Sequence, residues 1–171
     1  MSKAALRLIS LDPDAIASIE ADVLAFASER GLDTGAYAEL IGEMARANAA
    51  LPSRGGIDGE PWWGGYLAIE RETALVVGMC AYKTPPRDGE VEIAYFTFPA
   101  FERRGIGSAM AALLVSTAAE SSEVTMVIAH TLPELNPSGL ILTCNNFTRA
   151  GEMIDPEDGL VWRWERAVSG A

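Results

Sequence analysis

One segment in the middle of the chain limits the possible fold more than any other, because it has the pattern of a strand, a glycine loop, a helix and a second strand. We expect the strands at residues 90–98 and 124–130 and the loop at residues 102–107. Residues 108–119 carry apolar side chains at spacings of three and four, which is typical of a helix. A helix that joins two strands in this way makes them parallel. The segment therefore predicts a mixed α/β sheet.

The remaining elements follow from the periods of the apolar residues and from turn residues. In chain order they are a strand at 6–9, a helix from Asp12-Pro13 to Gly31, a helix between Thr34 and Pro52, strands at 66–70 and 74–82, a helix at 138–144, and two strands flanking a turn at 155–159. Residues 51–65 are expected to form a loop. The sequence has no internal repeat and no linker, so we expect one domain over residues 1–171, with about seven strands and four helices.

The balance of charged residues limits the partners of the chain. It has 24 Asp and Glu residues against 13 Lys and Arg residues, and its formal net charge is -11. A protein that binds duplex nucleic acid needs clustered cations to neutralise phosphates. An anionic membrane surface attracts the same residue types. We therefore expect neither a nucleic acid nor a membrane as a partner.

The cysteines and the apolar segments predict a reduced, cytoplasmic protein. Arg7 and Asp12 interrupt the N-terminal segment before the apolar core of a signal peptide is formed. The longest apolar stretch, residues 106–119, is shorter than the ~20 residues that span a bilayer. Cys80 and Cys144 have no metal-ligand spacing around them and imply no disulfide framework. We expect no bound metal.

The glycine loop before the central helix has the features of an anion site. Gly105 and Gly107 allow the backbone to approach a phosphate closely, and Arg103 and Arg104 add positive charge. The helix that begins near Ser108 offers unpaired N–H groups and the positive end of its dipole. The loop lacks the Gly-Lys-Ser/Thr of a P-loop and the third glycine of a dinucleotide fingerprint. The alternative is a glycine connector that only turns the chain.

Further motifs extend the pattern of this loop. Residues 102–107, Glu-Arg-Arg-Gly-Ile-Gly, match a signature of the form Gln/Arg-x-x-Gly-x-Gly/Ala that follows a fourth strand, and residues 89–95, 130–138 and 145–164 carry additional matches. With these motifs the sequence resembles the GNAT superfamily of N-acetyltransferases, which use acetyl-CoA. It looks most like a bacterial branch similar to the ribosomal-protein N-terminal acetyltransferases. The resemblance covers residues 65–166, and it includes the N-terminal helices only by their order.

The resemblance implies a GNAT-type fold in which the fourth and fifth strands are parallel and splay apart at their C-terminal ends. The pantetheine arm of acetyl-CoA would lie in that gap. The cofactor contacts that it implies are Phe96, Thr97 and Phe98 for the arm, Arg103, Arg104, Gly105, Ile106, Gly107 and Ser108 for the pyrophosphate, and Asn136 and Ser138 at the start of the fourth helix. Capping of that helix is an alternative or additional role for Asn136 or Ser138.

The sequence departs from the family pattern at two positions that concern the site. Glu102 stands where relatives most often have Gln or Arg, and a carboxylate beside a pyrophosphate is repulsive unless it points to solvent. Leu142 stands where several relatives carry a Tyr that protonates the departing thiolate. Cofactor binding is little affected by these changes. The general acid is left without a clear candidate.

Two side chains are candidates for handling the proton of the acceptor amine. Glu92 matches the strand glutamate that serves as a base in GNAT enzymes, directly or through a water, and its apolar surroundings raise its proton affinity. A salt bridge or cap to a neighbouring strand is the alternative for Glu92. His130, the one histidine, lies at the end of the strand beside the expected thioester. It is expected to bind the substrate or to deprotonate the amine, and a structural role is the alternative.

The acceptor is expected to enter over the loop at residues 51–65, where Trp62 and Trp63 would form an aromatic wall. We assign Trp63 to substrate binding, and the alternative is that at least one of the two packs in the core.

The whole pattern predicts an enzyme that transfers an acetyl group from acetyl-CoA to a primary amine by direct attack in a ternary complex. The acceptor would be a small molecule or the N-terminus of a peptide or protein. One alternative is a non-catalytic CoA-binding module of the same fold, which Leu142 favours. Another is a structural α/β protein with a fortuitous glycine loop. The resemblance also implies a homodimer through the C-terminal strand pair as one option.

Overall fold

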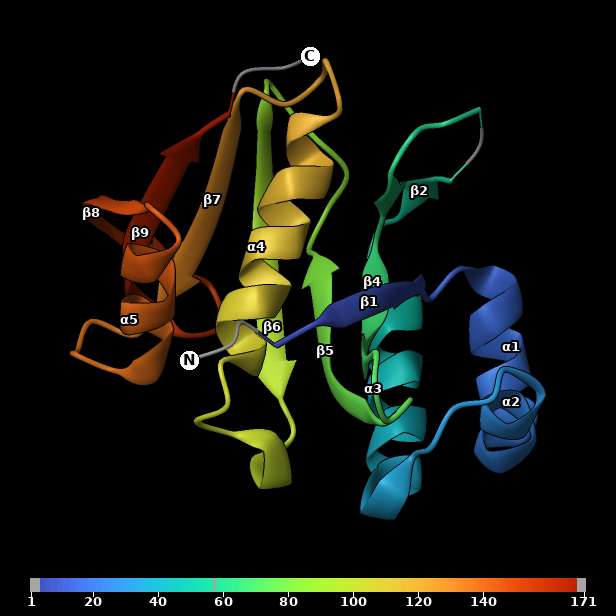
Figure 1. Cartoon of the computed structure of the whole chain (residues 1–171). Helices are drawn as coiled ribbons and strands as arrows, with labels where there is room; N and C mark the ends of the chain where they lie inside the picture. Colours follow the sequence, from blue (N-terminus) through green and yellow to red (C-terminus); the bar gives the residue numbers. More distant parts are fainter. Residues whose placement is uncertain (1–3, 57, 169–171) are drawn as a thin grey trace.

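The computed structural model describes residues 4–56 and 58–168, which form a seven-stranded mixed sheet with helices on both faces (Figure 1). The strand order is β1-β4-β5-β6-β7-β9-β8, and β2 and β3 form a separate two-stranded sheet. The strands are β1 (Leu6–Ser10), β2 (Arg54–Gly55), β3 (Trp62–Trp63), β4 (Gly65–Glu70), β5 (Val76–Tyr82), β6 (Glu90–Thr97), β7 (Met126–Thr131), β8 (Thr148–Asp155) and β9 (Gly159–Ala167). The helices are α1 (Pro13–Ala21), α2 (Val23–Glu29), α3 (Ala38–Ala49), α4 (Ile106–Ala119) and α5 (Pro137–Cys144), with 3-10 turns at Gly35–Tyr37 and Pro99–Phe101.

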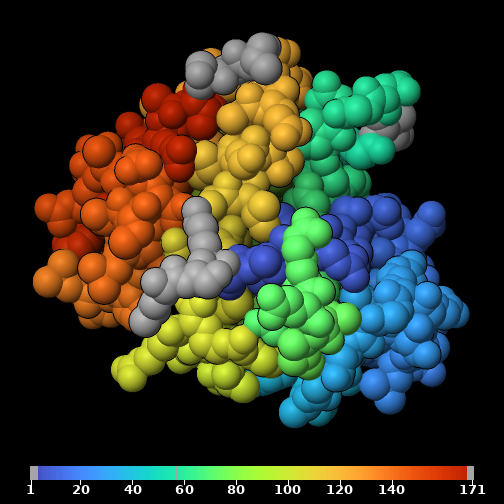
Figure 2. All heavy atoms as spheres, viewed as in Figure 1, coloured from blue at the N-terminus to red at the C-terminus, as the bar shows by residue number. Residues whose placement is uncertain are grey.

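The sheet separates two apolar cores, because successive side chains of a strand point to opposite faces. On one face, Val91 and Ile93 of β6 share a core with buried residues of α4. On the other face, Leu67, Ile69 and Met79 share a core with residues of α1, α2 and α3. In the space-filling view, the surface of α4 lies between the C-terminal segments on one side and the β2–β3 hairpin on the other (Figure 2).

The parallel pair expected from the sequence is present and is formed by β6 and β7, the fourth and fifth strands of the large sheet in chain order. Residues Glu90–Glu92 pair with Met126–Ile128. From residue 93 onward β6 still pairs with β5, but in the described part of the chain it has no ladder with β7. The two strands therefore part before their C-terminal ends. The prediction of a mixed sheet of the GNAT type is confirmed.

The first predicted helix is wrong in one respect, because it is two helices that meet at Asp22. The backbone of Asp22 is extended (φ -164°, ψ 105°), and its side chain accepts a hydrogen bond from the N–H of Ala25 at 3.0 Å. An aspartate in this conformation begins a new helix. The described part of the chain therefore has five α-helices where about four were expected.

The expected loop at residues 51–65 contains a short hairpin. Arg54 and Gly55 of β2 pair with Trp63 and Trp62 of β3. Gly55 has a φ of +103°, and a Cβ at this position would stand 2.1 Å from the carbonyl oxygen of Pro61. The close approach of the two strands therefore requires glycine here. The segment is rich in Gly and Pro and has no regular spacing of apolar residues, so its sequence pattern does not predict the hairpin.

Among the helices that the structure describes, none combines the length and the apolar composition needed to cross a membrane.

Candidate active site

The glycine loop leads into α4 through a left-handed residue. Gly105 precedes the first residue of α4 and has a φ of +77°, and Arg103 also has a positive φ of 62°. No side chain of the described residues caps the helix start. The N–H groups of the first turn, at residues 106–108, are therefore available as donors. They form the kind of site to which an anion binds.

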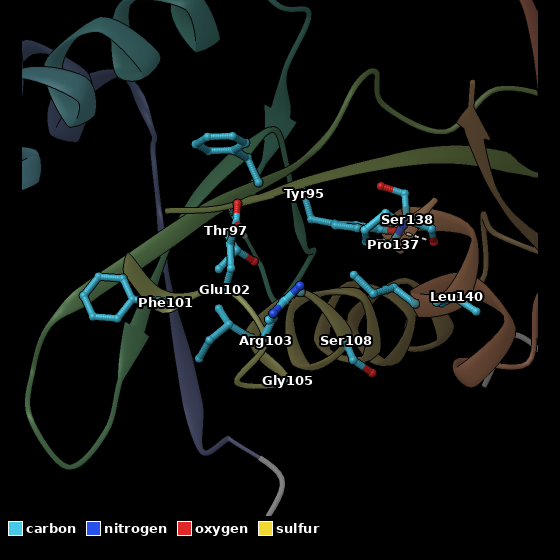
Figure 3. A pocket seen from close by; sticks show the side chains of 14 residues that line it. Tyr95, Thr97, Phe101, Glu102, Arg103, Gly105, Ser108, Pro137, Ser138 and Leu140 are labelled. Carbon is cyan, nitrogen blue, oxygen red and sulfur yellow. Dashed lines mark hydrogen bonds between the residues drawn. The ribbon is translucent and has the colours of Figure 1, made fainter. Parts of the chain in front are cut away.

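A groove of about 490 Å³ lies between the start of α4, the C-terminal half of β6 and the start of α5 (Figure 3). Most of the residues predicted to bind the cofactor line it: Phe96, Thr97, Arg103, Gly105, Ile106, Gly107, Ser108 and Ser138. These residues come from three segments that are far apart in the sequence. The structure thus brings together the two ends of the predicted cofactor site.

The floor of the groove is held by contacts between β6, α4 and α5. The Tyr95 hydroxyl donates a hydrogen bond to the backbone carbonyl of Ser138 at 3.2 Å, and Figure 3 shows the two residues facing each other. Burial raises the pKa of Tyr95 far above its usual range, so the phenol stays protonated as a donor. A Cβ added to Gly107 would stand 2.7 Å from Cδ1 of Ile141. Small size at position 107 therefore lets α4 approach α5.

Three of the predicted cofactor residues do not line the groove. The side chain of Phe98 is fully buried in the core beneath α3, and its N–H donates to the carbonyl of Val77 at 3.0 Å. Arg104 turns away from the groove and bonds Glu70 at 2.5 Å. Asn136 caps α5, because its side chain accepts a hydrogen bond from the N–H of Gly139 at 2.9 Å. The alternative role of Asn136 as a cap is therefore observed.

Sequence reasoning missed several walls of the groove. They are Tyr95, Phe101, Pro137, Leu140 and Ile141, together with Glu102, which was noted only as a departure from the family pattern. Tyr95 carries a signal that was available, since it is two residues from Thr97 and strand residues two apart share a face. The others depend on how α5 and the turn before α4 pack, which the local sequence does not determine.

A second cavity of about 310 Å³ lies on the α3 side of the sheet and shares Tyr95 and Phe96 with the groove. Its walls come from α3, β5, β6 and the β8–β9 turn: Met44, Asn48, Leu51, Met79, Cys80, Ala81, Lys83, Ala94 and Glu157. Phe96 is 44% exposed and lines both spaces. Trp63, expected to contact the acceptor, is fully buried against Tyr82 and forms no wall of either cavity.

The two predicted proton-handling residues are in direct contact. Nδ1 of His130 lies 2.9 Å from Oε1 of Glu92, and Nζ of Lys83 lies 2.8 Å from the same oxygen. The side chains of Glu92 and His130 are 20% and 10% exposed. Nε2 of His130 is buried and has no hydrogen-bond partner among the described residues. Lys83, which the sequence did not single out, joins this pair to the second cavity.

Other charges surround the pair. Arg163 of β9, which is paired with His130 in the sheet, bonds Glu90 at 2.8 Å and Glu165 at 2.7 Å. Asp155 lies near the pair at the β8–β9 turn. Backbone hydrogen bonds from residues 158 and 157 lower the pKa of Asp155, and the charges of Lys83 and His130 lower it further. Four carboxylates and two cations therefore lie near His130, namely Glu90, Glu92, Asp155 and Glu165 with Lys83 and Arg163.

Comparison with protein families assigns the chain to one family. The model of the acetyltransferase (GNAT) domain matches residues 7–148. The chain belongs to the GNAT acetyltransferase family. This acetyltransferase is an enzyme that depends on acetyl-CoA. The groove at the start of α4 fits that co-substrate. The free amides of the helix start and Arg103 suit a pyrophosphate, and the apolar walls suit an extended arm.

Solved structures of acetyltransferases share this fold over nearly the whole chain. A RimL ribosomal L7/L12 α-N-protein acetyltransferase in complex with coenzyme A is 16% identical, with a TM-score of 0.66 over 99% of this chain and 97% of that chain. The enzyme from Salmonella typhimurium that modifies the N-terminal serine of L7/L12 is 18% identical, with a TM-score of 0.65 over 98% and 97%. A GNAT acetyltransferase from Bacillus anthracis is 14% identical, with a TM-score of 0.63 over 98% and 97%. No curated protein matches the chain significantly in sequence.

Proposed function

We propose that this acetyltransferase acts on the N-terminal amine of a peptide or protein in the cytoplasm, as a single domain. The observation that carries the proposal is that the groove and the second cavity share Tyr95 and Phe96. A thioester at the end of the groove and an amine in the second cavity would meet at Phe96. Two relatives of the same fold act on the N-terminus of a ribosomal protein. Residues of α3 and of the β8–β9 turn wall the second cavity, and the chain behind the amine would contact them.

The groove supports acetyl-CoA by two kinds of contact. The amides of residues 106–108 and the side chain of Arg103 would hold the pyrophosphate. The backbone of Phe96 and Thr97 would bind the pantetheine arm, because β6 has no partner strand on its β7 side beyond Glu92 in the described residues. Arg104 and Asn136 would support these contacts indirectly, through Glu70 and through the cap of α5.

Transfer requires a neutral amine, a polarised thioester carbonyl and a stabilised leaving thiolate. Holding the two reactants in contact at Phe96 supplies a large part of the rate, since well-oriented reactants avoid the entropy of meeting. The amine must also lose a proton. Glu92 and His130 would receive it, directly or through a water, because Glu92 contacts Lys83 at the wall of the second cavity and His130 contacts Glu92.

The C-terminal strand pair also supports the proposal of a homodimer. Strand β8 is the edge of the large sheet, and residues 148–154 are exposed along its length. Met153, Ile154 and Leu160 are exposed apolar side chains of this pair. An exposed edge strand presents free N–H and C=O groups to a second chain. We expect light scattering to give the mass of a dimer, and the mass of the monomer in Ile154→Lys; a monomeric wild-type protein would contradict the proposal.

The acceptor class is tested with matched peptides. One peptide has a free N-terminus and no lysine, and its partner has a blocked N-terminus and one lysine; small primary amines complete the set. We expect release of free CoA thiol with the first peptide and, by mass spectrometry, one acetyl group on its α-amine. Turnover only on lysine or only on small amines would contradict the proposal.

A further inference from the structure

The contacts around His130 indicate how the acceptor would lose its proton. Three polar side chains form one chain, from Lys83 just after β5 through Glu92 of β6 to His130 of β7. Nζ of Lys83 and Nδ1 of His130 both lie within 2.9 Å of Oε1 of Glu92. His130 lies one residue before the end of β7, beyond the last pair that this strand makes with β6. The chain therefore begins at the wall of the second cavity, where Lys83 lies, and ends in the region where β6 and β7 have separated.

The hydrogen bonds fix which nitrogen of His130 carries the proton. A carboxylate oxygen only accepts hydrogen bonds, so Nδ1 of His130 must donate to Glu92. Nε2 then carries the free lone pair of the neutral ring. In the described residues Nε2 has no donor, although it is buried. A buried acceptor without a donor costs about 1–3 kcal/mol, and that cost is removed when a donor arrives.

We propose that Nε2 of His130 accepts the proton of the acceptor amine, directly or through one water, and that Glu92 is a positioning residue that holds the ring. The assignment rests on the proposed function. It changes the role expected for Glu92, because the oxygen nearest the ring already accepts from two donors. A carboxylate bonded to one imidazole nitrogen sets the tautomer and stabilises the cation that forms.

Lys83 completes the arrangement by balancing the carboxylate. Its ammonium group shares Oε1 of Glu92 with the ring. The other charges around His130 come from neighbouring elements: Arg163 on β9, with Glu90 and Glu165, and Asp155 at the β8–β9 turn. In this set four carboxylates, Glu90, Glu92, Glu165 and Asp155, stand against two cations, Lys83 and Arg163.

The acceptor arrives as an ammonium ion and gives one proton to Nε2 of His130. The neutral amine then forms a C–N bond with the thioester carbonyl carbon, and the C–S bond breaks with its electron pair on sulfur. The second amine proton leaves with the thiolate as the CoA thiol, and His130 returns the first proton to solvent. The products are the acetylated amine, the CoA thiol and one proton.

The tautomer can be measured without turnover, because His130 is the one histidine of the chain. Nitrogen-15 NMR of histidine-labelled protein reports the two ring nitrogens separately. We expect a protonated Nδ1 and an unprotonated Nε2 in the neutral ring. In Glu92→Gln, the amide can donate to the ring as well as accept from it, so we expect a mixture of tautomers. A wild-type ring with its proton on Nε2 would overturn the assignment.

Kinetics on the peptide with a free N-terminus test the chemical role. We expect His130→Gln to lower kcat by about 100-fold or more, as removal of a general base does, with KM for acetyl-CoA unchanged. One ionisation should disappear from its pH profile of kcat/KM. Glu92→Gln should lower kcat by about tenfold and alter the same ionisation, as a loss of positioning and not of the base.

The control removes an ion-paired carboxylate elsewhere. Glu123 bonds Arg54 at 2.7 Å and is 45% exposed, and Glu123→Gln should leave kcat and the pH profile as in the wild type. An active wild-type enzyme with an equally active His130→Gln variant would overturn the assignment alone. A wild-type protein that binds acetyl-CoA and acetylates none of the amines would overturn the proposed function and the assignment together.

Discussion

Gly107 of α4 lies against Ile141 of α5, and a Cβ built on Gly107 would stand 2.7 Å from Cδ1 of Ile141. The contact joins the helix whose start offers free amides to the helix that forms the opposite wall of the groove. It therefore couples the width of the groove to the size of one side chain.

Gly107→Ala should destabilise the protein and weaken acetyl-CoA binding. The extra methyl group forces Ile141 to move, and overpacking of this kind costs about 1–3 kcal/mol. Urea unfolding measures the stability, and calorimetric titration measures the affinity. Ile141→Val removes the clashing Cδ1, so the double variant Gly107→Ala, Ile141→Val should recover most of both losses. Equal losses in the single and double variants would contradict the role of this contact.

Acetyl-CoA binding should require Gly105 because of its backbone conformation, and not because a larger side chain would clash with its neighbours. Its φ is +77°, and nothing lies within 4 Å of a Cβ at this position. A β-branched side chain in this conformation is strained by about 1–2 kcal/mol, so Gly105→Val should raise the dissociation constant of acetyl-CoA by about tenfold. Asn tolerates the left-handed region, and Gly105→Asn should bind within about threefold of the wild type. Identical affinities for the Val and Asn variants would contradict this explanation.

Replacing each of the two adjacent arginines should change the affinity for acetyl-CoA to a different extent. Arg103 lines the groove, whereas Arg104 bonds Glu70. Arg103→Gln should weaken acetyl-CoA binding by about tenfold, since a hydrogen bond to a charged group contributes about 1.5–3 kcal/mol. Its affinity should also depend less on salt, because a screened charge pair has been removed. Arg104→Gln is the matched control and should change the affinity by less than about twofold; the opposite order of effects would show that the groove is assigned to the wrong arginine.

Alkaline pH should unfold the protein partly through Cys80. Burial raises the pKa of this thiol far above its ordinary value of 9.0. Above about pH 9 the unfolded chain loses the thiol proton while the folded chain keeps it, so the free energy of unfolding falls as the pH rises. Urea unfolding between pH 8 and 11 should show this slope and a smaller slope in Cys80→Ala. Cys144 is exposed, and Cys144→Ala should keep the wild-type slope; a wild-type slope in Cys80→Ala would contradict the linkage.

The parts of the site that could be predicted from the sequence are those determined by local chemistry. The glycine loop, the helix that follows it and the apolar strands on both sides have residue types that fix their backbone. Gly105 has the positive φ that a glycine there permits, and Asn136 caps α5 as its position before Pro137 indicates. The order of the elements and the parallel pair follow from the same signals.

The rest depends on contacts between segments far apart in the sequence. Lys83 meets Glu92 because β5 and β6 pair in one particular register. Trp63 is in the core because the β2–β3 hairpin turns it toward Tyr82. The break at Asp22 lies within a continuous apolar pattern, and only the extended backbone there reveals it. Local periodicity determines none of these three features.

The most direct test of the site is a titration of the nitrogen-15-labelled protein with acetyl-CoA, followed by the amide resonances of Ile106, Gly107 and Ser108. These N–H groups start α4 and line the groove. If they bind the pyrophosphate, their proton resonances should move downfield together and saturate. Pantetheine, which has no phosphate group, should not move them. Saturable binding that shifts other amides and leaves these three unmoved would contradict the account.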